Sequence, residues 1–196
     1  MKKEVVSFSF GKNWLDYIKD FNWERYIEIK QSMSDLFGTS LQGKSFIDIG
    51  CGSGVFSLAA AELDAGYVLS VDIDPNSVLA TNKIKELYER VNWKVVQGSI
   101  LDENFLKEID KFDIVYSWGV LHHTGNMWKA IDNASELVKK GGILAIAIYN
   151  KTITSPFWLW FKRLYNRQRS DFIKKLMVLS IFDVVLFLCD FIPNGS

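Results

Sequence analysis

The chain has 196 residues, 48% of them hydrophobic, and its 23 basic and 23 acidic side chains give a formal net charge of zero. This length supports one domain with a substantial core, and the hydrophobic share excludes a largely disordered chain. Because the net charge is zero, the chain as a whole has no electrostatic attraction for nucleic acid.

Cysteine usage and the N-terminus indicate the compartment. The only cysteines are Cys51 and Cys189, which are too few and too far apart to imply a disulfide framework. The first residues, Met-Lys-Lys-Glu-Val-Val-Ser, lack the long apolar core of a signal peptide. We therefore expect a soluble, cytoplasmic protein.

The chain begins with a predicted helix and continues as an alternation of strands and helices. Apolar side chains recur at helical spacing over 12–37, and Gly38 can end that helix. Short runs rich in Val, Ile and aromatic residues predict five strands, at 45–49, 67–71, 93–96, 112–116 and 143–149. Helical character lies between them, at 55–64, 76–90, about 103–110 and 126–140. This order predicts an α/β fold, a Rossmann-like and mostly parallel sheet with flanking helices.

Domain boundaries follow from the same pattern. We expect an N-terminal helical cap over 1–40, a core over 41–150 and a helical C-terminal segment over 151–196. The fourth core helix is expected to end in cationic residues, with Gly141–Gly142 as its C-terminal cap.

A glycine-spaced turn follows the first core strand. Asp48 lies near the end of that strand, and Gly50, Gly52 and Gly54 follow with Cys51 between the first two. Glycines tolerate positive φ and lack a Cβ, so the backbone can bend sharply and approach a ligand closely. The helix that follows offers unpaired N–H groups to polar ligand atoms. We read Cys51 as a small residue that fills the turn, not as a nucleophile.

The spacing of these glycines distinguishes between cofactors. The dinucleotide fingerprint is G-x-G-x-x-G, whereas Val55 follows a G-x-G-x-G pattern here. The segment resembles motif I of the class I S-adenosylmethionine-dependent methyltransferases. The resemblance implies that the turn wraps the methionine and ribose portion of S-adenosylmethionine, which becomes S-adenosylhomocysteine after transfer.

The second strand ends in two carboxylates. Asp72, followed by Ile73, lies 24 residues after Asp48, and matches the acidic residue expected to accept hydrogen bonds from ribose hydroxyls. Asp74 is better explained as a helix N-cap, because Pro75 suits the first helical position.

The third strand ends at Ser99 and Ile100. The family often has an Asp that contacts the adenine amino group here, beside an apolar residue against the ring. Ser99 stands at the Asp position, and its hydroxyl accepts a hydrogen bond more weakly than a carboxylate does. Asp102 lies close enough in the sequence to take that place.

The fourth strand leads into Ser117, Trp118 and a Val-Leu-His-His sequence. This arrangement is similar to motif IV of small-molecule class I methyltransferases, which implies that Ser117 and Trp118 meet the cofactor and that the acceptor binds nearby. His122 and His123 are the chain's only histidines. A neutral imidazole at this place could take a proton from a hydroxyl as methyl transfer proceeds, but either histidine could instead orient the loop.

The resemblance covers roughly residues 44–149 and implies a methyltransferase acting on a small-molecule or lipid-like acceptor. A SAM-binding regulatory or interaction module without catalysis is the first alternative. RNA methylation through a basic stretch at 162–175 is the second, although no nucleic acid is expected as a partner. No metal site is predicted.

The end of the chain departs from the family pattern. The family's sheet usually closes with an antiparallel hairpin, but nothing after residue 150 reads as those strands, so we expect a truncated chain. Aromatic and apolar residues over 157–192 instead predict helices that could contact a membrane surface or mediate homo-oligomerisation. A membrane-spanning helix is disfavoured there, because the apolar run is short and carries two carboxylates.

Overall fold

The computed structural model describes residues 22–86, 88, 92–150, 161, 164, 165, 167, 168, 170 and 173. The chain divides into two compact units, residues 1–149 and 150–196, and all the elements named below belong to the first. The part of the expected 12–37 helix that precedes residue 22 lies outside the described residues, as do most of the residues in the helices expected over 157–192. The division into domains at residues 40 and 150 therefore stays a prediction. Within the described ranges, no helix combines the length and hydropathy that crossing a membrane requires.

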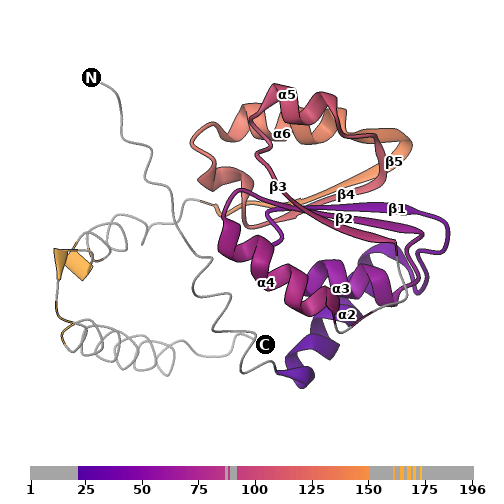
Figure 1. The fold of residues 1–196 in the computed structure, drawn as a ribbon, viewed down its shortest axis with the longest axis horizontal. Helices are drawn as coiled ribbons and strands as arrows, with labels where there is room; N and C mark the ends of the chain where they lie inside the picture. Colours follow the sequence, from indigo (N-terminus) through magenta and orange to yellow (C-terminus); the bar gives the residue numbers. More distant parts are fainter. Residues whose placement is uncertain are drawn as a thin grey trace, which may run out of the picture. The chain divides into compact units, whose positions relative to one another are not determined.

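The first unit is built on a parallel five-stranded sheet of order β3-β2-β1-β4-β5 (Figure 1). Its strands are β1 (Ser45–Ile49), β2 (Tyr67–Asp72), β3 (Trp93–Gln97), β4 (Phe112–Trp118) and β5 (Val138–Ala147). Its helices are α2 (Trp23–Phe37), α3 (Val55–Glu62), α4 (Pro75–Glu86), α5 (Glu103–Lys107) and α6 (Met127–Glu136), with a 3₁₀ turn η1 (Leu121–His123). The α/β, Rossmann-like prediction is confirmed.

The sheet has an apolar core on each face. Helices α2, α3 and α4 cover one face, and α5 and α6 cover the other (Figure 1). Along β1 the side chains alternate, so Phe46 joins the core on the α2–α3 side, whereas Ile47 and Ile49 join the core on the α5–α6 side. Strand order reverses between β1 and β4, and open α/β sheets bind ligands at the carboxyl ends of the strands at such a point.

The start of β5 corrects one sequence prediction. The helix expected over 126–140 ends at Glu136, and the strand begins at Val138 instead of residue 143. Between the pairs Phe112↔Val138 and Ile114↔Ile143, β5 bulges over Lys139–Gly142 while β4 has only Asp113. The glycines therefore do not cap a helix. Gly141 has φ +78°, and a Cβ on Gly142 would lie 2.7 Å from the Asp113 carbonyl oxygen, so the glycine pair permits the bulge.

Asp113 ties this bulge to the start of β1. Its carboxylate accepts hydrogen bonds from the Ser45 backbone N–H (2.8 Å), the Ser45 hydroxyl (2.7 Å) and the Lys139 ammonium (2.9 Å). These donors, the Ser45 N–H most of all, hold the pKa of Asp113 well below its usual range. One partly exposed carboxylate thus joins β1, β4 and β5 at their amino-terminal ends.

We predict that Asp113→Ala lowers the free energy of unfolding by roughly 1–2 kcal/mol at pH 7, because three donors lose their acceptor. The pKa of Asp113 is depressed in the folded state, so its contribution is present above the unfolded-state pKa of about 4 and is lost as pH falls below it. Urea unfolding at pH 7 and pH 3 measures both effects. Asp132→Ala, at an exposed position in α6, is the control, and an equal loss in the two variants would contradict the prediction.

Candidate functional site

The turn after β1 has the backbone that its glycines predict. Gly50, Gly52 and Gly54 have φ values of +80°, +55° and +85°, and Gly54 is the N-cap of α3. The Gly50 and Cys51 N–H groups donate to the Val71 carbonyl oxygen at 2.7 and 3.1 Å, which ties the turn to the end of β2. Only glycine adopts such a series of positive φ values without strain.

Two of these glycines are required by contacts within the protein. A Cβ on Gly50 would lie 2.4 Å from Val120 Cγ1, and a Cβ on Gly54 would lie 2.7 Å from Thr81 Cγ2. Val120 follows β4, so the turn after β1 and the turn after β4 are packed directly together. The glycine spacing therefore serves the packing of the protein as well as the approach of a ligand.

Cys51 fills the turn, as the sequence predicts. Its side chain is buried, with Sγ 3.3 Å from Thr81 Oγ1. Burial raises the pKa of its thiol well above the usual range, which opposes thiolate formation. The Thr81 hydroxyl also donates to the Gly52 carbonyl oxygen at 3.2 Å, so Thr81 supports the turn from α4.

Asp72 lies at the end of β2, against the glycine turn. Its carboxylate accepts hydrogen bonds from the Gly52 N–H (3.0 Å) and the Asp74 N–H (2.9 Å). Burial raises the pKa of this carboxyl above its usual value, while the backbone donors oppose the rise. A carboxylate offers about four acceptor positions, so capacity remains for further donors. Beside it, Ile73 is 65% exposed. Asp74 caps α4 through the Asn76 N–H (2.9 Å), as predicted.

Asp48 is buried and faces the protein. The Ser57 hydroxyl of α3 donates to its carboxyl group at 2.7 Å, the Ser70 hydroxyl donates to Ser57 at 2.6 Å, and the Trp93 indole N–H donates to Ser70 at 2.8 Å. Burial raises the pKa of Asp48 to about 7, with the nearby Asp72 charge contributing and the Ser57 hydroxyl opposing. Asp48 is thus the end of a polar chain through the core.

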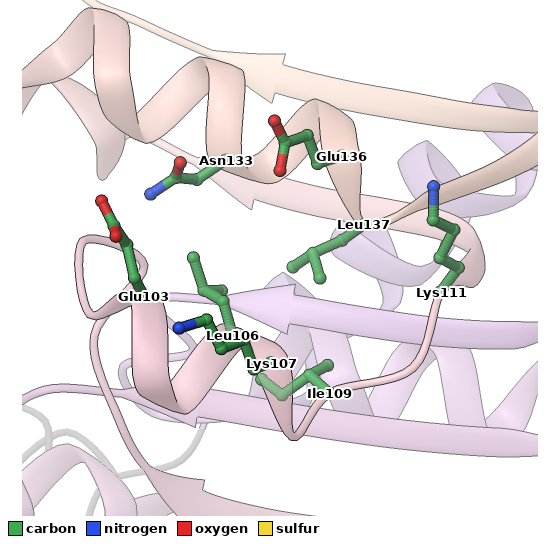
Figure 2. A pocket seen from close by; sticks show the side chains of 8 residues that line it. All are labelled: Glu103, Leu106, Lys107, Ile109, Lys111, Asn133, Glu136 and Leu137. Atoms are coloured by element: carbon green, nitrogen blue, oxygen red, sulfur yellow. The ribbon is translucent and has the colours of Figure 1, made fainter.

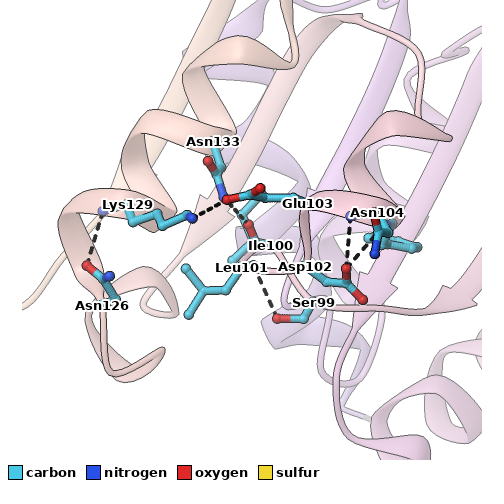
Figure 3. A network of polar contacts seen from close by, with 10 residues as sticks. Ser99, Ile100, Leu101, Asp102, Glu103, Asn104, Asn126, Lys129 and Asn133 are labelled. Atoms are coloured by element: carbon cyan, nitrogen blue, oxygen red, sulfur yellow. Dashed lines mark hydrogen bonds and ion pairs between the residues drawn. The ribbon is translucent and has the colours of Figure 1, made fainter.

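Polar side chains stabilise the turn after β3 by accepting hydrogen bonds from its own backbone. The Ser99 hydroxyl accepts from the Leu101 N–H (3.2 Å), and Asp102 caps α5 by accepting from the Asn104 N–H (3.0 Å) (Figure 3). Asn133 of α6 donates to the Ile100 carbonyl oxygen at 2.7 Å. Ile100 itself is buried in the core on the α5–α6 side, so Ile73 is the exposed apolar side chain at this edge.

The structure places Ser117 and Trp118 differently from each other. Ser117 is buried, and its hydroxyl donates to the Ile49 carbonyl oxygen at 2.8 Å, which joins the ends of β4 and β1. The Trp118 ring is 52% exposed and stacks parallel to Tyr116, with 5.7 Å between ring centroids. Trp118 therefore offers an aromatic surface at the carboxyl end of β4, whereas the Ser117 hydroxyl holds the scaffold.

The two histidines both lie in η1, next to a third ring that sequence reasoning missed. The His122 ring centroid is 4.0 Å from that of His123 and 4.5 Å from that of Tyr149. Both ring nitrogens of His122 are buried without a hydrogen-bond partner in the described part of the chain, whereas His123 is exposed. The signal for Tyr149 was its place at the end of the expected fifth strand, 143–149, at the same sheet edge as the other candidates.

A separate pocket of about 430 Å³ lies between α5 and α6 (Figure 2). It is lined by apolar and charged side chains: Glu103, Leu106, Lys107, Ile109, Lys111, Asn133, Glu136 and Leu137. None of the predicted site residues lines it. Among the described residues, no three His, Cys, Asp or Glu side chains are arranged to hold a metal ion.

Comparisons with known proteins indicate the family of the chain. A family model described as a methyltransferase domain matches residues 47–144. The ubiquinone biosynthesis O-methyltransferase of Pelagibacter ubique is 27% identical over 166 residues, which cover 79% of this chain and 67% of that protein. Its counterpart in Glaesserella parasuis is 31% identical over 163 residues, which cover 77% and 65%. The chain thus spans about two thirds of the length of these relatives.

A solved structure supports the fold. Magnesium protoporphyrin IX methyltransferase from Synechocystis, determined with bound S-adenosylhomocysteine, matches with a TM-score of 0.60 and 20% identity. The match covers 86% of this chain and 81% of that one. At this identity the likeness shows the Rossmann-like fold.

We predict that Gly50→Ala destabilises the protein more than Gly43→Ala does, by roughly 1–3 kcal/mol, because the new Cβ would overlap Val120. Gly43 is the matched control, since its φ of +74° is similar but a Cβ there would meet nothing within 4 Å. Adding Val120→Ala to Gly50→Ala should recover part of the loss in urea unfolding. If Gly50→Ala and Gly43→Ala lower the free energy of unfolding equally, the prediction that a Cβ at position 50 overlaps Val120 is wrong.

As pH rises from 5 to 8, we predict that the free energy of unfolding of the wild type falls by roughly 1–3 kcal/mol relative to that of Asp48→Asn. The folded-state pKa of Asp48, about 7, lies above the unfolded value of about 4, so the folded protein binds the extra proton in this window. The stability that this proton gives is lost as pH rises through 7. Urea unfolding at several pH values measures the difference, and Asp132→Asn is the exposed control. If the difference in the free energy of unfolding between the wild type and Asp48→Asn does not depend on pH, burial does not raise the pKa of Asp48 as predicted.

Proposed function

The chain belongs to the methyltransferase-domain family of Rossmann-like, S-adenosylmethionine-dependent enzymes, and from this premise we propose that it methylates an oxygen atom of a small-molecule or lipid-like acceptor. The family's cofactor is S-adenosylmethionine. The preference for oxygen rests on the two O-methyltransferase relatives. The observation that carries the proposal is the juxtaposition of the positive-φ glycine turn with the Asp72 carboxylate.

The residues at the carboxyl edge of the sheet fit this cofactor. Asp72 keeps acceptor capacity for ribose hydroxyls beyond its backbone donors, and Ile73 presents an exposed apolar surface suited to a flat base. The turn at 50–54 supplies the close backbone approach, and Ser99 lies at the end of the neighbouring strand. Bound there, S-adenosylmethionine supplies a methyl group activated by its sulfonium.

The chain's own contribution is to position the acceptor and to manage its proton. Trp118 and Tyr149 give exposed aromatic surface at the ends of β4 and β5, which suits an apolar or aromatic acceptor. His122 and His123 stand at the same edge as candidates to receive a proton. Exclusion of water and in-line placement of the acceptor account for most of the catalysis expected of such a site.

The partners and the location expected from the sequence remain proposals. Contact with a membrane surface and homo-oligomerisation both depend on residues 157–192, most of which lie outside the described part of the chain. The basic stretch at 162–175 that would serve RNA methylation lies in the same region. The proposal of a cytoplasmic location is supported by the cysteine usage.

Calorimetry with S-adenosylhomocysteine tests the cofactor site. We predict that Asp72→Asn weakens binding about 10-fold or more, because a carboxylate that accepts hydrogen bonds from the ligand is replaced by an amide. Asp74→Asn is the matched control, since it removes the neighbouring charge and keeps a residue that caps helices equally well. If the wild type shows no saturable binding, the proposed function fails.

Turnover distinguishes the enzyme from its alternatives. Purified protein is incubated with radiolabelled S-adenosylmethionine and a panel of phenols, catechols, carboxylic acids, hydroxylated lipids and total RNA. Label transferred to a hydroxyl acceptor supports the proposal. Binding of S-adenosylmethionine without transfer to any acceptor supports the non-catalytic module. Transfer confined to RNA supports RNA methylation.

A further inference from the structure

Three aromatic rings form a cluster at the carboxyl ends of β4 and β5. The His122 ring is tilted by 49° to His123 and by 47° to Tyr149 at centroid distances of 4.0 and 4.5 Å, and the His123 and Tyr149 rings meet edge to face at 5.9 Å. The Nδ1 and Nε2 atoms of His122 are both buried and have no hydrogen-bond partner among the described residues. A buried polar group left unpaired destabilises the fold, so its presence requires an explanation.

The position of His122 connects this unpaired group to the cofactor site. Val120, two residues earlier, packs against the Gly50 backbone closely enough to exclude a Cβ there. The Ser117 hydroxyl holds the end of β4 to the Ile49 carbonyl oxygen at 2.8 Å. The segment that carries His122 is therefore fixed directly against the glycine turn, at the point where the strand order reverses.

Tyr149 packs against His122. Tyr149 is 75% exposed, so it forms an outer part of the ring cluster. Its hydroxyl lies 3.7 Å from where a Cβ of Gly119 would be, and Gly119 has φ +74°, so the β4 turn leaves room for the ring. Burial lowers the pKa of His122, which favours the neutral imidazole with a free lone pair near pH 7. Tyr149 and His123 are the titratable side chains that contact the His122 ring in the described part of the chain.

We propose that His122 is the catalytic residue that accepts the acceptor's proton, and that Tyr149 is a positioning residue that orients the His122 ring and shields it from water. This inference rests on the proposed function. As the acceptor oxygen bonds to the methyl carbon, the carbon–sulfur electron pair stays on sulfur. The O–H electron pair stays on oxygen, and the proton passes to a ring nitrogen of His122. The exposed His123 ring borders the same cluster.

NMR of the histidine rings tests the shielding without any turnover. The chain has two histidines, so His123→Gln assigns the His122 signals unambiguously. We expect His122 to titrate below the ordinary value of about 6.5 in the wild type and to move toward it in Tyr149→Ala. Tyr149→Phe keeps the ring and should leave the titration unchanged. A His122 that titrates at its ordinary value in the wild type, or that does not respond to Tyr149→Ala, overturns the role of Tyr149.

Kinetics tests the proton transfer, with the panel acceptor that turned over fastest in the assay above. We expect His122→Asn to lower kcat by about 10²- to 10⁴-fold, the usual range for loss of a general base. Affinity for S-adenosylhomocysteine should stay within about threefold of wild type, because the proton leaves the acceptor and not the cofactor. Asp132→Asn, at an exposed position in α6, is the control and should keep kcat within about fivefold.

The pH profile separates positioning from a merely structural role. In the wild type, kcat should rise with pH, and the midpoint of this rise should match the His122 titration midpoint measured by NMR. In Tyr149→Ala, the kcat midpoint and the NMR midpoint should rise together. A His122→Asn enzyme that keeps its kcat while binding and turnover persist overturns this inference alone. Absence of transfer to every acceptor defeats the proposed function, and this inference with it.

Discussion

The close contact between Gly50 and Val120 is the constraint on which the rest of the site depends. Strands β1 and β4 are neighbours at the point where strand order reverses, and the helices that follow them, α3 and α6, cover opposite faces of the sheet (Figure 1). The turns after these strands meet because Gly50, which has no Cβ, lies against the Val120 side chain. The Ser117 hydroxyl also donates a hydrogen bond to the Ile49 carbonyl oxygen. The elements that would hold a methyl donor and those that would face an acceptor are therefore one packed unit.

Two carboxylates near this contact differ because their surroundings differ. Asp72 remains partly accessible and receives backbone donors from the turn, so it is suited to an ionised, ligand-facing role. Asp48 is enclosed and accepts a hydrogen bond from the Ser57 hydroxyl, at the end of a chain that begins at Trp93. Burial raises its pKa toward neutrality, and the Asp72 charge acts in the same direction. The outer carboxylate thus suits binding, and the inner one links α3 to the sheet.

The sequence predicted the strands and the glycine turn well, because both are specified by local chemistry. Apolar runs of strand length alternated with helical patterns, and glycine alone tolerates the φ values of the turn. The start of β5 was mispredicted, since Lys139–Gly142 satisfy the local rules for a helix end equally well. The ion pair between Lys139 and Asp113, across 26 residues, belongs to a bulge instead.

The sequence by itself determined the fold class, the place of the glycine turn and the carboxylate beside it. These features depend on residue type and on spacing along the chain. Only the tertiary structure decided which side chains face outward. Ser117 and Ile100 turn into the scaffold, Ile73 and Trp118 remain exposed, and Tyr149 lies over His122. Such orientations arise from strand register, sheet twist and contacts between residues distant in the sequence, which no local pattern encodes.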